Sequence, residues 1–308
     1  MGSRCIARKG FALALFAALF AAAPAGADIL YATNFNTNTI EKFTGGGAPS
    51  LFATSSISGL AGLAIDSAGN FYVTHYFANS IEKFTPGGVS SVFASTGLSN
   101  PVALAFDRTG NLYAANYGNN TIEKYTNGVG AVFASTGLSG PEGLAFDRAG
   151  NLYVANNSNG TIEKYTSGGA NSVFASTGLT SPFSLAFDAA GNLYAANYGN
   201  NTIEKFTSGG SGSLFSSSGV NGPGGMAFDS AGNLYLVNTQ NNTIEKYAST
   251  GIDLGAFATT GLSAPEFLAF TNDAGVPLPL PIPEPSTGVL LCLGLPSLLL
   301  RIRRRDAK

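Results

Sequence analysis

Residues 141–165 read PEGLAFDRAGNLYVANNSNGTIEKY, and this stretch contains three short strand-like runs separated by two turns. Between the apolar runs at 143–146 and 152–155, Asp147 can hydrogen-bond the backbone two residues on and Gly150 can take a positive φ. A second turn leads to the run at 161–165, and a third leads to the apolar run at 172–175. No segment shows the 3.6-residue spacing of a helix, so we expect an all-β unit of four strands.

The same unit occurs six times in the chain. The triplet Ile-Glu-Lys recurs with spacings of 41, 41, 40, 41 and 41 residues, beginning at Ile40, Ile81, Ile122, Ile162, Ile203 and Ile244. A period near 41 residues with four short strands is typical of the blades of a β-propeller. The strand-like runs are apolar on both faces, as expected for sheets packed between neighbouring sheets.

The two ends of the repeat array are out of phase. The array begins at 29–32 with a second strand that lacks its first, and it finishes at 267–270 with a first strand that lacks the other three. One strand plus three strands makes a complete blade. We therefore predict an all-β, six-bladed propeller over residues 28–275, closed 1+3 between the N- and C-terminal strands, so that no sheet edge of an open array is exposed.

The charge distribution divides the chain into three parts. The formal net charge is −2, but residues 28–275 contain eight Lys/Arg and sixteen Asp/Glu, whereas residues 1–27 and 276–308 each have a charge of +3. An acidic body is a poor match for a phosphate backbone, so we expect no nucleic-acid partner. With one His in the chain and both Cys in the terminal segments, the body has neither a multi-His metal centre nor a disulfide.

The first 27 residues have the features of a secretory signal peptide. A basic start precedes an apolar run at 11–23, and the small residues Ala25 and Ala27 occupy the −3 and −1 positions before Asp28. The apolar run is shorter than the ~20 residues that span a membrane comfortably. We expect export of the chain, with cleavage by signal peptidase after Ala27.

Residues 276–308 contain three successive features. A Pro-rich linker at 276–287 includes Pro283, Glu284 and Pro285, and residues 288–308 contain the apolar run 289–300 followed by a basic terminus. Twelve residues make a helix of about 18 Å, against a hydrocarbon core of about 30 Å, so we expect only transient membrane association. This arrangement resembles the PEP-CTERM sorting signal of Gram-negative bacteria. The resemblance implies processing by an exosortase, a membrane protease-transpeptidase, and a location at the cell surface or outside the cell.

The repeat, on the residues quoted at 141–156 and 161–165, resembles the NHL repeat, and the resemblance extends over nearly all of 28–275. NHL propellers mostly bind other molecules, and related six-bladed propellers include metal-dependent lactonases similar to gluconolactonase. The resemblance therefore implies a propeller that acts as a binding module, with a lactonase-like hydrolase as the alternative.

Residues that recur in every repeat are interpreted as scaffold. Adjacent residues of a strand point to opposite faces, so we expect each Lys of the Ile-Glu-Lys triplets to pair with a Glu of the neighbouring blade. The Asp that ends five of the six inner strands, and the Asn-Thr steps at Asn120, Asn201 and Asn242, are expected to form turns; the sixth copy has Thr271 in place of the Asp.

Binding sites are expected where the repeats differ. The second residue of each inner strand should lie near the mouth of the central channel, and in the six repeats it is Ala61, Val102, Glu142, Phe183, Gly224 and Glu266. Glu142 and Glu266 are the only charged members of this set, with Phe183 and Gly224 between them. Together with nearby Asn side chains they could hold a divalent cation through oxygen ligands. The complete ligand set of the lactonase-like metal site cannot be matched.

A second variable position follows the second strand of each repeat. Its members are Asn34, His75, Asn116, Asn156, Asn197 and Asn238, and Tyr76, Phe77, Tyr117 and Tyr198 follow closely. Two interpretations stay open. Amide groups and aromatic faces suit a carbohydrate ligand, or the Asn side chains form a structural ring that caps the hairpins. His75 has no motif that places a nucleophile beside it, so Ser-His-Asp catalysis is not favoured.

These patterns favour an exported, monomeric propeller without catalytic residues or a cofactor, which binds a surface polysaccharide or another surface component. The candidate binding residues are Glu142, Glu266, His75, Asn116, Asn156, Asn197 and Asn238. The alternatives are a metal-dependent lactonase or hydrolase at the channel mouth, and a purely structural matrix protein.

Overall fold

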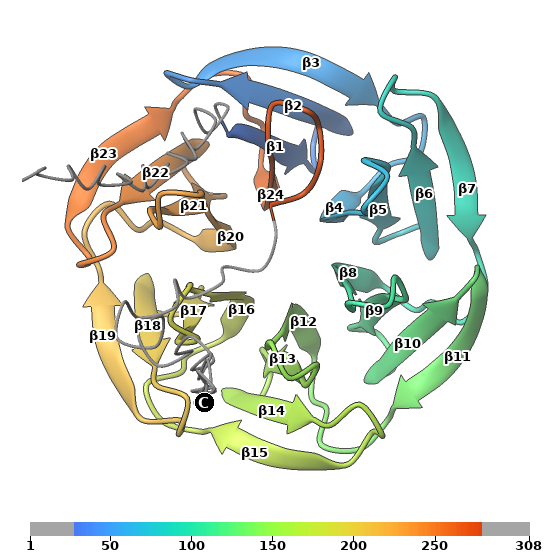
Figure 1. Ribbon diagram of the computed structural model, residues 1–308, viewed down its shortest axis with the longest axis vertical. Coiled ribbons are helices and arrows are strands. Elements are labelled where there is room, and N and C mark those ends of the chain that lie inside the picture. Colours follow the sequence, from blue (N-terminus) through green and yellow to red (C-terminus); the bar gives the residue numbers. More distant parts are fainter. Residues whose placement is uncertain (1–27, 279–308) are drawn as a thin grey trace, which may run out of the picture.

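The computed structural model describes residues 28–278. Within them, 24 strands form six four-stranded antiparallel sheets arranged as blades around a central axis (Figure 1). The expectation of an all-β, six-bladed propeller is therefore confirmed. In this part of the chain, no helix is long and apolar enough to cross a membrane.

Four rings of strands follow one another from the axis outward. The innermost ring comprises β4 (Leu60–Ile65), β8 (Pro101–Phe106), β12 (Pro141–Phe146), β16 (Pro182–Phe187), β20 (Pro223–Phe228) and β24 (Pro265–Thr271). The second ring comprises β1 (Ile29–Asn34), β5 (Phe71–His75), β9 (Leu112–Asn116), β13 (Leu152–Asn156), β17 (Leu193–Asn197) and β21 (Leu234–Asn238). The third ring comprises β2 (Thr39–Thr44), β6 (Ser80–Phe84), β10 (Thr121–Thr126), β14 (Thr161–Tyr165), β18 (Thr202–Phe206) and β22 (Thr243–Tyr247). The outer ring comprises β3 (Ala48–Thr54), β7 (Ser90–Ala94), β11 (Val129–Ala134), β15 (Asn171–Ala175), β19 (Gly212–Ser216) and β23 (Asp253–Ala258).

One blade combines the two ends of the propeller. Its strand order is β24-β1-β2-β3, whereas each of the other five blades uses four consecutive strands. Strand β24 pairs antiparallel with β1, with Leu30 opposite Phe270 and Ile29 opposite Thr271. The predicted 1+3 closure is confirmed.

The recurring Asp and Asn residues form the turns that the sequence predicts. In the turn between β12 and β13, Asp147 Oδ1 accepts a hydrogen bond from the Asn151 backbone at 2.8 Å, and Asn151 Nδ2 donates to Asp147 Oδ2 at 2.7 Å. Gly150 in this turn has φ 83°. Asn120 has φ 55° and accepts a hydrogen bond from the Gly140 backbone in the next blade at 2.7 Å. The Asn side chain therefore joins two blades as well as forming a turn.

Aromatic side chains fill the space between the blades. Tyr153 packs edge-on against Phe174 of its own outer strand, with ring centroids 4.9 Å apart, and against Phe187 of the next blade at 5.1 Å. The same arrangement recurs around the propeller, for example at Tyr235 and Phe270 with centroids 5.0 Å apart. The core is thus a series of apolar layers between adjacent blades, which explains why the inner strands are apolar on both faces.

The predicted ion pairs between blades are wrong. In the described residues, the Lys side chains that form ion pairs do so within their own blade: Lys205 Nζ lies 3.6 Å from Asp188 Oδ2 and 5.1 Å from the centroid of the Tyr194 ring. The register places Lys205 directly opposite Tyr194, so the amine extends along the ring toward the turn. Glu204 instead lies against Gly178 of the preceding connection.

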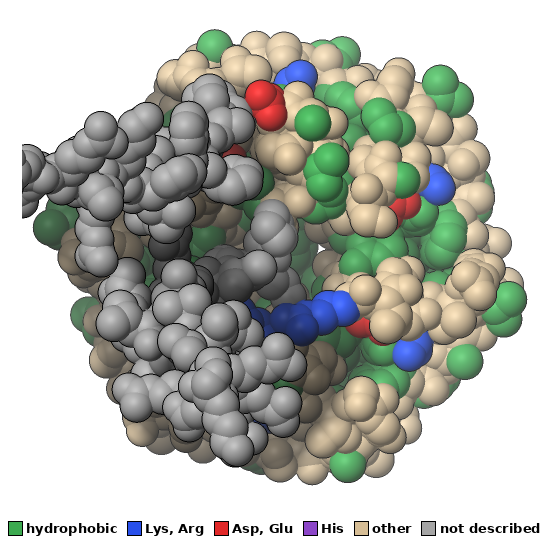
Figure 2. All heavy atoms as spheres, in the orientation of Figure 1, with side chains coloured by type: hydrophobic (Ala, Val, Ile, Leu, Met, Phe, Trp, Pro, Cys, Tyr) green, Lys and Arg blue, Asp and Glu red, His purple; other side chains and the backbone are tan. Residues whose placement is uncertain are grey.

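Large apolar side chains are exposed on all six outer strands. They are Leu51, Val92, Val129, Val132, Val173, Leu214 and Leu254. Figure 2 shows apolar side chains dispersed around the periphery among polar ones. Apolar residues scattered singly are normal on a protein surface and do not define an interface.

We expect Phe270→Ala to lower the free energy of unfolding by about 3–5 kcal/mol, because it leaves a cavity in the closing blade. Phe270 is buried against Tyr235 of the neighbouring blade. Urea denaturation measures the change, with Val92→Ala on an exposed outer strand as the matched control, for which we expect a change below about 0.5 kcal/mol. A loss below about 1 kcal/mol for Phe270→Ala would mean that packing at the closure contributes little.

Candidate functional site

The two ends of the central channel differ in chemistry. The inner strands begin at one end, which we call the mouth; it carries the candidate residues Glu142 and Glu266. They finish at the other end, which we call the base; there five strands end in Phe or Ile before an Asp turn, and β24 ends in Thr271 before Asn272.

Glu142 on β12 and Glu266 on β24 lie on opposite sides of the mouth. In either direction around the ring, two blades lie between the blade of Glu142 and the blade of Glu266. Figure 1 shows β12 and β24 on opposite sides of the axis. Burial, and next the charge of Glu266, raise the pKa of Glu142 to about 8 against an opposing hydrogen bond from the Asn157 side chain. Burial raises the pKa of Glu266 to about 7. Both carboxyl groups therefore change charge near neutral pH.

Aromatic side chains surround this pair of carboxyl groups. Phe183, the neighbour of Glu142 in the ring, has its centroid 5.4 Å from that of Phe267, which follows Glu266 in β24. Tyr76 and Tyr117 lie on the adjoining blades with centroids 6.4 Å apart. The pKa of Tyr76 is raised by burial, by Tyr117 and by Glu142, which places Tyr76 within electrostatic reach of that carboxyl group.

The residue that directly follows the second strand of each blade varies between blades, and these six residues form a rim around the mouth, which we call the aromatic rim. It comprises Phe35, Tyr76, Tyr117, Asn157, Tyr198 and Thr239. The backbone amides of these residues donate to the carbonyl that precedes each inner strand, as Tyr117 does to Asn100 at 3.2 Å. The position therefore lies beside the strand starts. Sequence analysis noted three of its Tyr residues but missed the ring; its signal was the variability of the residue after the conserved Asn.

Buried hydroxyl groups hold the backbone of the mouth in place. Thr33 Oγ1 donates to the Ala61 carbonyl of the next blade at 2.6 Å, and Thr74 Oγ1 does the same to Val102 at 2.7 Å. Ser184 Oγ donates to the Gly224 carbonyl at 2.6 Å. The mouth is consequently a preformed arrangement that joins neighbouring blades.

The ring of Asn side chains lies inside the scaffold. Asn156 is completely buried: its Nδ2 donates to the Gly137 carbonyl at 2.8 Å and to Thr161 Oγ1 at 3.0 Å, and its Oδ1 accepts from the Ser139 backbone at 3.0 Å. The equivalent bonds fasten the other predicted candidates, Asn116, Asn197 and Asn238. No amide atom of these residues is left for a ligand, which favours the structural interpretation.

His75 also lies away from the mouth surface. It is completely buried, and its Nε2 lies 3.1 Å from Glu82 Oε2, which also accepts a hydrogen bond from Ser55 Oγ at 2.6 Å. Burial lowers the pKa of His75, against the opposing effect of Glu82. The structure therefore separates His75 from Glu142 and Glu266, and it reveals a buried Ser55–Glu82–His75 cluster that sequence analysis missed.

A metal site at the mouth would have few ligands. Within residues 28–278, no three His, Cys, Asp or Glu residues are placed to hold one metal ion. Glu142, Glu266, Asn157 and Gln240 offer carboxylate or amide oxygens at the mouth, whereas Ca²⁺ takes about six to eight oxygen ligands.

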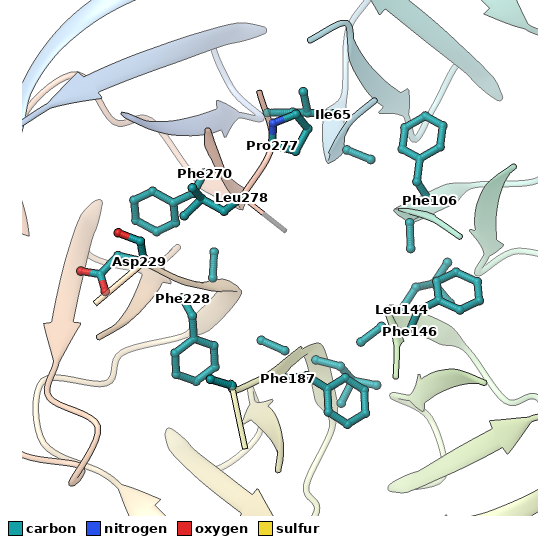
Figure 3. A pocket seen from close by; sticks show the side chains of 18 of the residues that line it. Ile65, Phe106, Leu144, Phe146, Phe187, Phe228, Asp229, Phe270, Pro277 and Leu278 are labelled. Atoms are coloured by element: carbon teal, nitrogen blue, oxygen red, sulfur yellow. The ribbon is translucent and has the colours of Figure 1, made fainter. Parts of the chain in front are cut away.

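The base of the channel is an apolar cavity of about 620 Å³. Figure 3 shows the labelled Phe rings, among them Phe106 and Phe187, pointing away from its centre, which leaves Ala and Leu side chains of the inner strands to line the space. Pro277 and Leu278 lie at its edge, and the Leu278 backbone amide donates to the Phe270 carbonyl at 3.2 Å.

The predicted sorting residues lie outside the described part of the chain. These are the signal-peptide segment 1–27 with its cleavage residue Ala27, and the motif Pro283, Glu284 and Pro285 with the tail 288–308. They stay predictions.

Comparison with known proteins identifies the fold. No protein-family profile and no curated protein matches the chain. Among solved structures it is similar to a chain of a nidogen/laminin complex, with a TM-score of 0.71 and 22% identity over 80% of this chain and 98% of that one. It is also similar to virginiamycin B lyase from Staphylococcus aureus with quinupristin (TM-score 0.59, 18% identity, 79% and 82% covered). A putative gluconolactonase is a further match (TM-score 0.60, 15% identity, 68% and 81% covered). At these identities the likeness establishes the six-bladed propeller fold alone.

We expect Glu142→Gln to remove part of the pH dependence of stability. A carboxyl group whose pKa is raised in the folded state contributes stability below its unfolded pKa of about 4.5, and this contribution is lost as the pH rises through about 8. The Gln variant should match the wild type at pH 4 and unfold at a temperature higher by roughly 2–4 °C or more at pH 8. Thermal unfolding by circular dichroism measures the difference. Asp273→Asn, at an exposed position, is the control. Parallel pH profiles of wild type and Glu142→Gln would contradict the raised pKa of Glu142.

Proposed function

We propose that this chain is an exported six-bladed propeller that acts as a binding module at the cell surface, with the channel mouth as its binding site. The observation that carries this proposal is the aromatic rim around Glu142 and Glu266. Its rings combine apolar faces with phenol groups, and Asn157 and Gln240 add amide groups. This chemistry suits the C–H faces and hydroxyl groups of a surface polysaccharide. The similar fold in the nidogen/laminin complex supports a binding role.

The proposal includes the route to the surface. Signal peptidase would remove residues 1–27, and an exosortase-like enzyme would process the chain near Pro283, Glu284 and Pro285. The membrane association through residues 288–308 would then be transient. The released body would retain an excess of acidic residues.

We expect Tyr117→Ala to reduce binding of oligosaccharides on a glycan array by roughly tenfold, because the variant removes one ring of the rim. The full chain is the wild-type reference. Val129→Ala, on the exposed outer strand β11, is the matched control and should bind as the wild type does. Equal binding by Tyr117→Ala and wild type, or no binding by the wild type to any glycan, would contradict this site and this class of ligand.

A second candidate function is hydrolysis of a lactone. Two carboxyl groups that titrate near neutral pH suit general acid–base catalysis, and a putative gluconolactonase shares the fold. A pH-stat assay with gluconolactone, with and without added Ca²⁺, distinguishes this candidate. Acid release that Glu142→Gln abolishes would favour an enzyme, and a rate equal to the uncatalysed one would favour the binding module.

A further inference from the structure

One carboxyl oxygen at the mouth has no partner among the described residues. Glu142 Oε2 is buried without a hydrogen-bond partner in the described residues. Within residues 28–278, the ion pairs involve other acidic residues, and neither Glu142 nor Glu266 pairs with a Lys, Arg or His. A carboxylate oxygen that is buried without a positive or hydrogen-bonding partner is costly, so Glu142 would gain from a ligand that donates to it when it is ionised.

The side chains around the two carboxyl groups suit one kind of cation better than another. A divalent metal ion requires many oxygen ligands, and Asn157 is the amide beside Glu142. Aromatic rings, by contrast, attract an organic ammonium group through their faces. Phe183 stands next to Glu142 in the ring and contacts Phe267, while Tyr76 and Tyr117 complete the rim. An ammonium group has three N–H donors, enough to bond more than one carboxylate oxygen.

We propose that the channel mouth binds the protonated amine of an amino sugar within a surface polysaccharide, held between Glu142 and Glu266 and enclosed by the aromatic rim. This proposal rests on the proposed function and names its ligand class. The amine supplies the N–H donors that Glu142 Oε2 lacks. The sugar ring to which the amine is attached packs on the aromatic faces, and the acidic body of the propeller adds a long-range attraction for a cationic polymer.

Binding of this ligand is coupled to proton release at the mouth. The two carboxyl groups must ionise to hold the amine, so affinity falls as the pH decreases from about 8 to about 6 and the groups take up protons. The phenol hydroxyl groups of the rim belong to Tyr76, Tyr117 and Tyr198, and burial raises the pKa of Tyr76 further from neutral pH. The carboxyl pair therefore governs the pH dependence contributed by the protein.

Isothermal titration calorimetry with three hexasaccharides tests the proposal on the full chain. We expect a hexamer of glucosamine to bind at least tenfold more tightly at pH 7.5 than a hexamer of N-acetylglucosamine or of glucose. The double variant Glu142→Gln/Glu266→Gln keeps the shape of both side chains and should lose this tenfold preference. Asp273→Asn, an exposed acidic residue outside the mouth, should keep it and thereby controls for the general loss of negative charge.

The possible results separate this proposal from the proposed function. Equal affinities for the three hexamers, weakened by Tyr117→Ala but not by the Gln variants, would overturn the amine proposal and leave a saccharide-binding module. A preference for glucosamine that the double variant retains would also overturn it, because the charge would then act elsewhere. Absence of binding to all three hexamers would overturn the amine proposal and remove this support for a saccharide-binding mouth.

Discussion

The pairing of β24 with β1 is the interaction on which the rest of the structure depends. It closes the ring of six blades, so the inner strands converge on one axis and no blade is left with an unpacked face. Because the ring is closed, residues at the same position of each repeat lie at the same level of the channel. Glu142 and Glu266 are distant in sequence but occupy the same position in their repeats, so they lie on opposite sides of the mouth.

The ring divides the residues of each repeat into two groups. The recurring residues make structural contacts: Asp147 accepts hydrogen bonds within its turn, Tyr153 packs against the neighbouring blade, and Asn156 bonds a connecting loop. Those that vary at the mouth are not needed for these contacts and are free to differ in chemistry. The apolar base and the carboxyl-containing mouth are consequently two distinct environments on one rigid scaffold.

The fold followed from the sequence because period, turn residues and the out-of-phase ends are local patterns. Glu142 and Glu266 were identified because they depart from the repeat. The predicted partner of Lys205 was wrong, because strand alternation identifies the face on which a side chain lies but not its partner. The partner depends on the register with Tyr194 and on the position of the Asp188 turn. The buried role of Asn156 depended on the path of the connecting loop, which the spacing of repeats does not reveal.

Glu142 and Glu266 are two half-buried carboxyl groups at the mouth of a closed propeller, and we expect both to titrate near neutral pH. The most direct test is an NMR titration of the full chain labelled with ¹³C at the Glu side-chain carboxyls, with Glu142→Gln and Glu266→Gln used to assign the two signals. We expect midpoints at about 8 for Glu142 and about 7 for Glu266. Midpoints of both signals at the ordinary Glu value of about 4.3 would contradict this expectation.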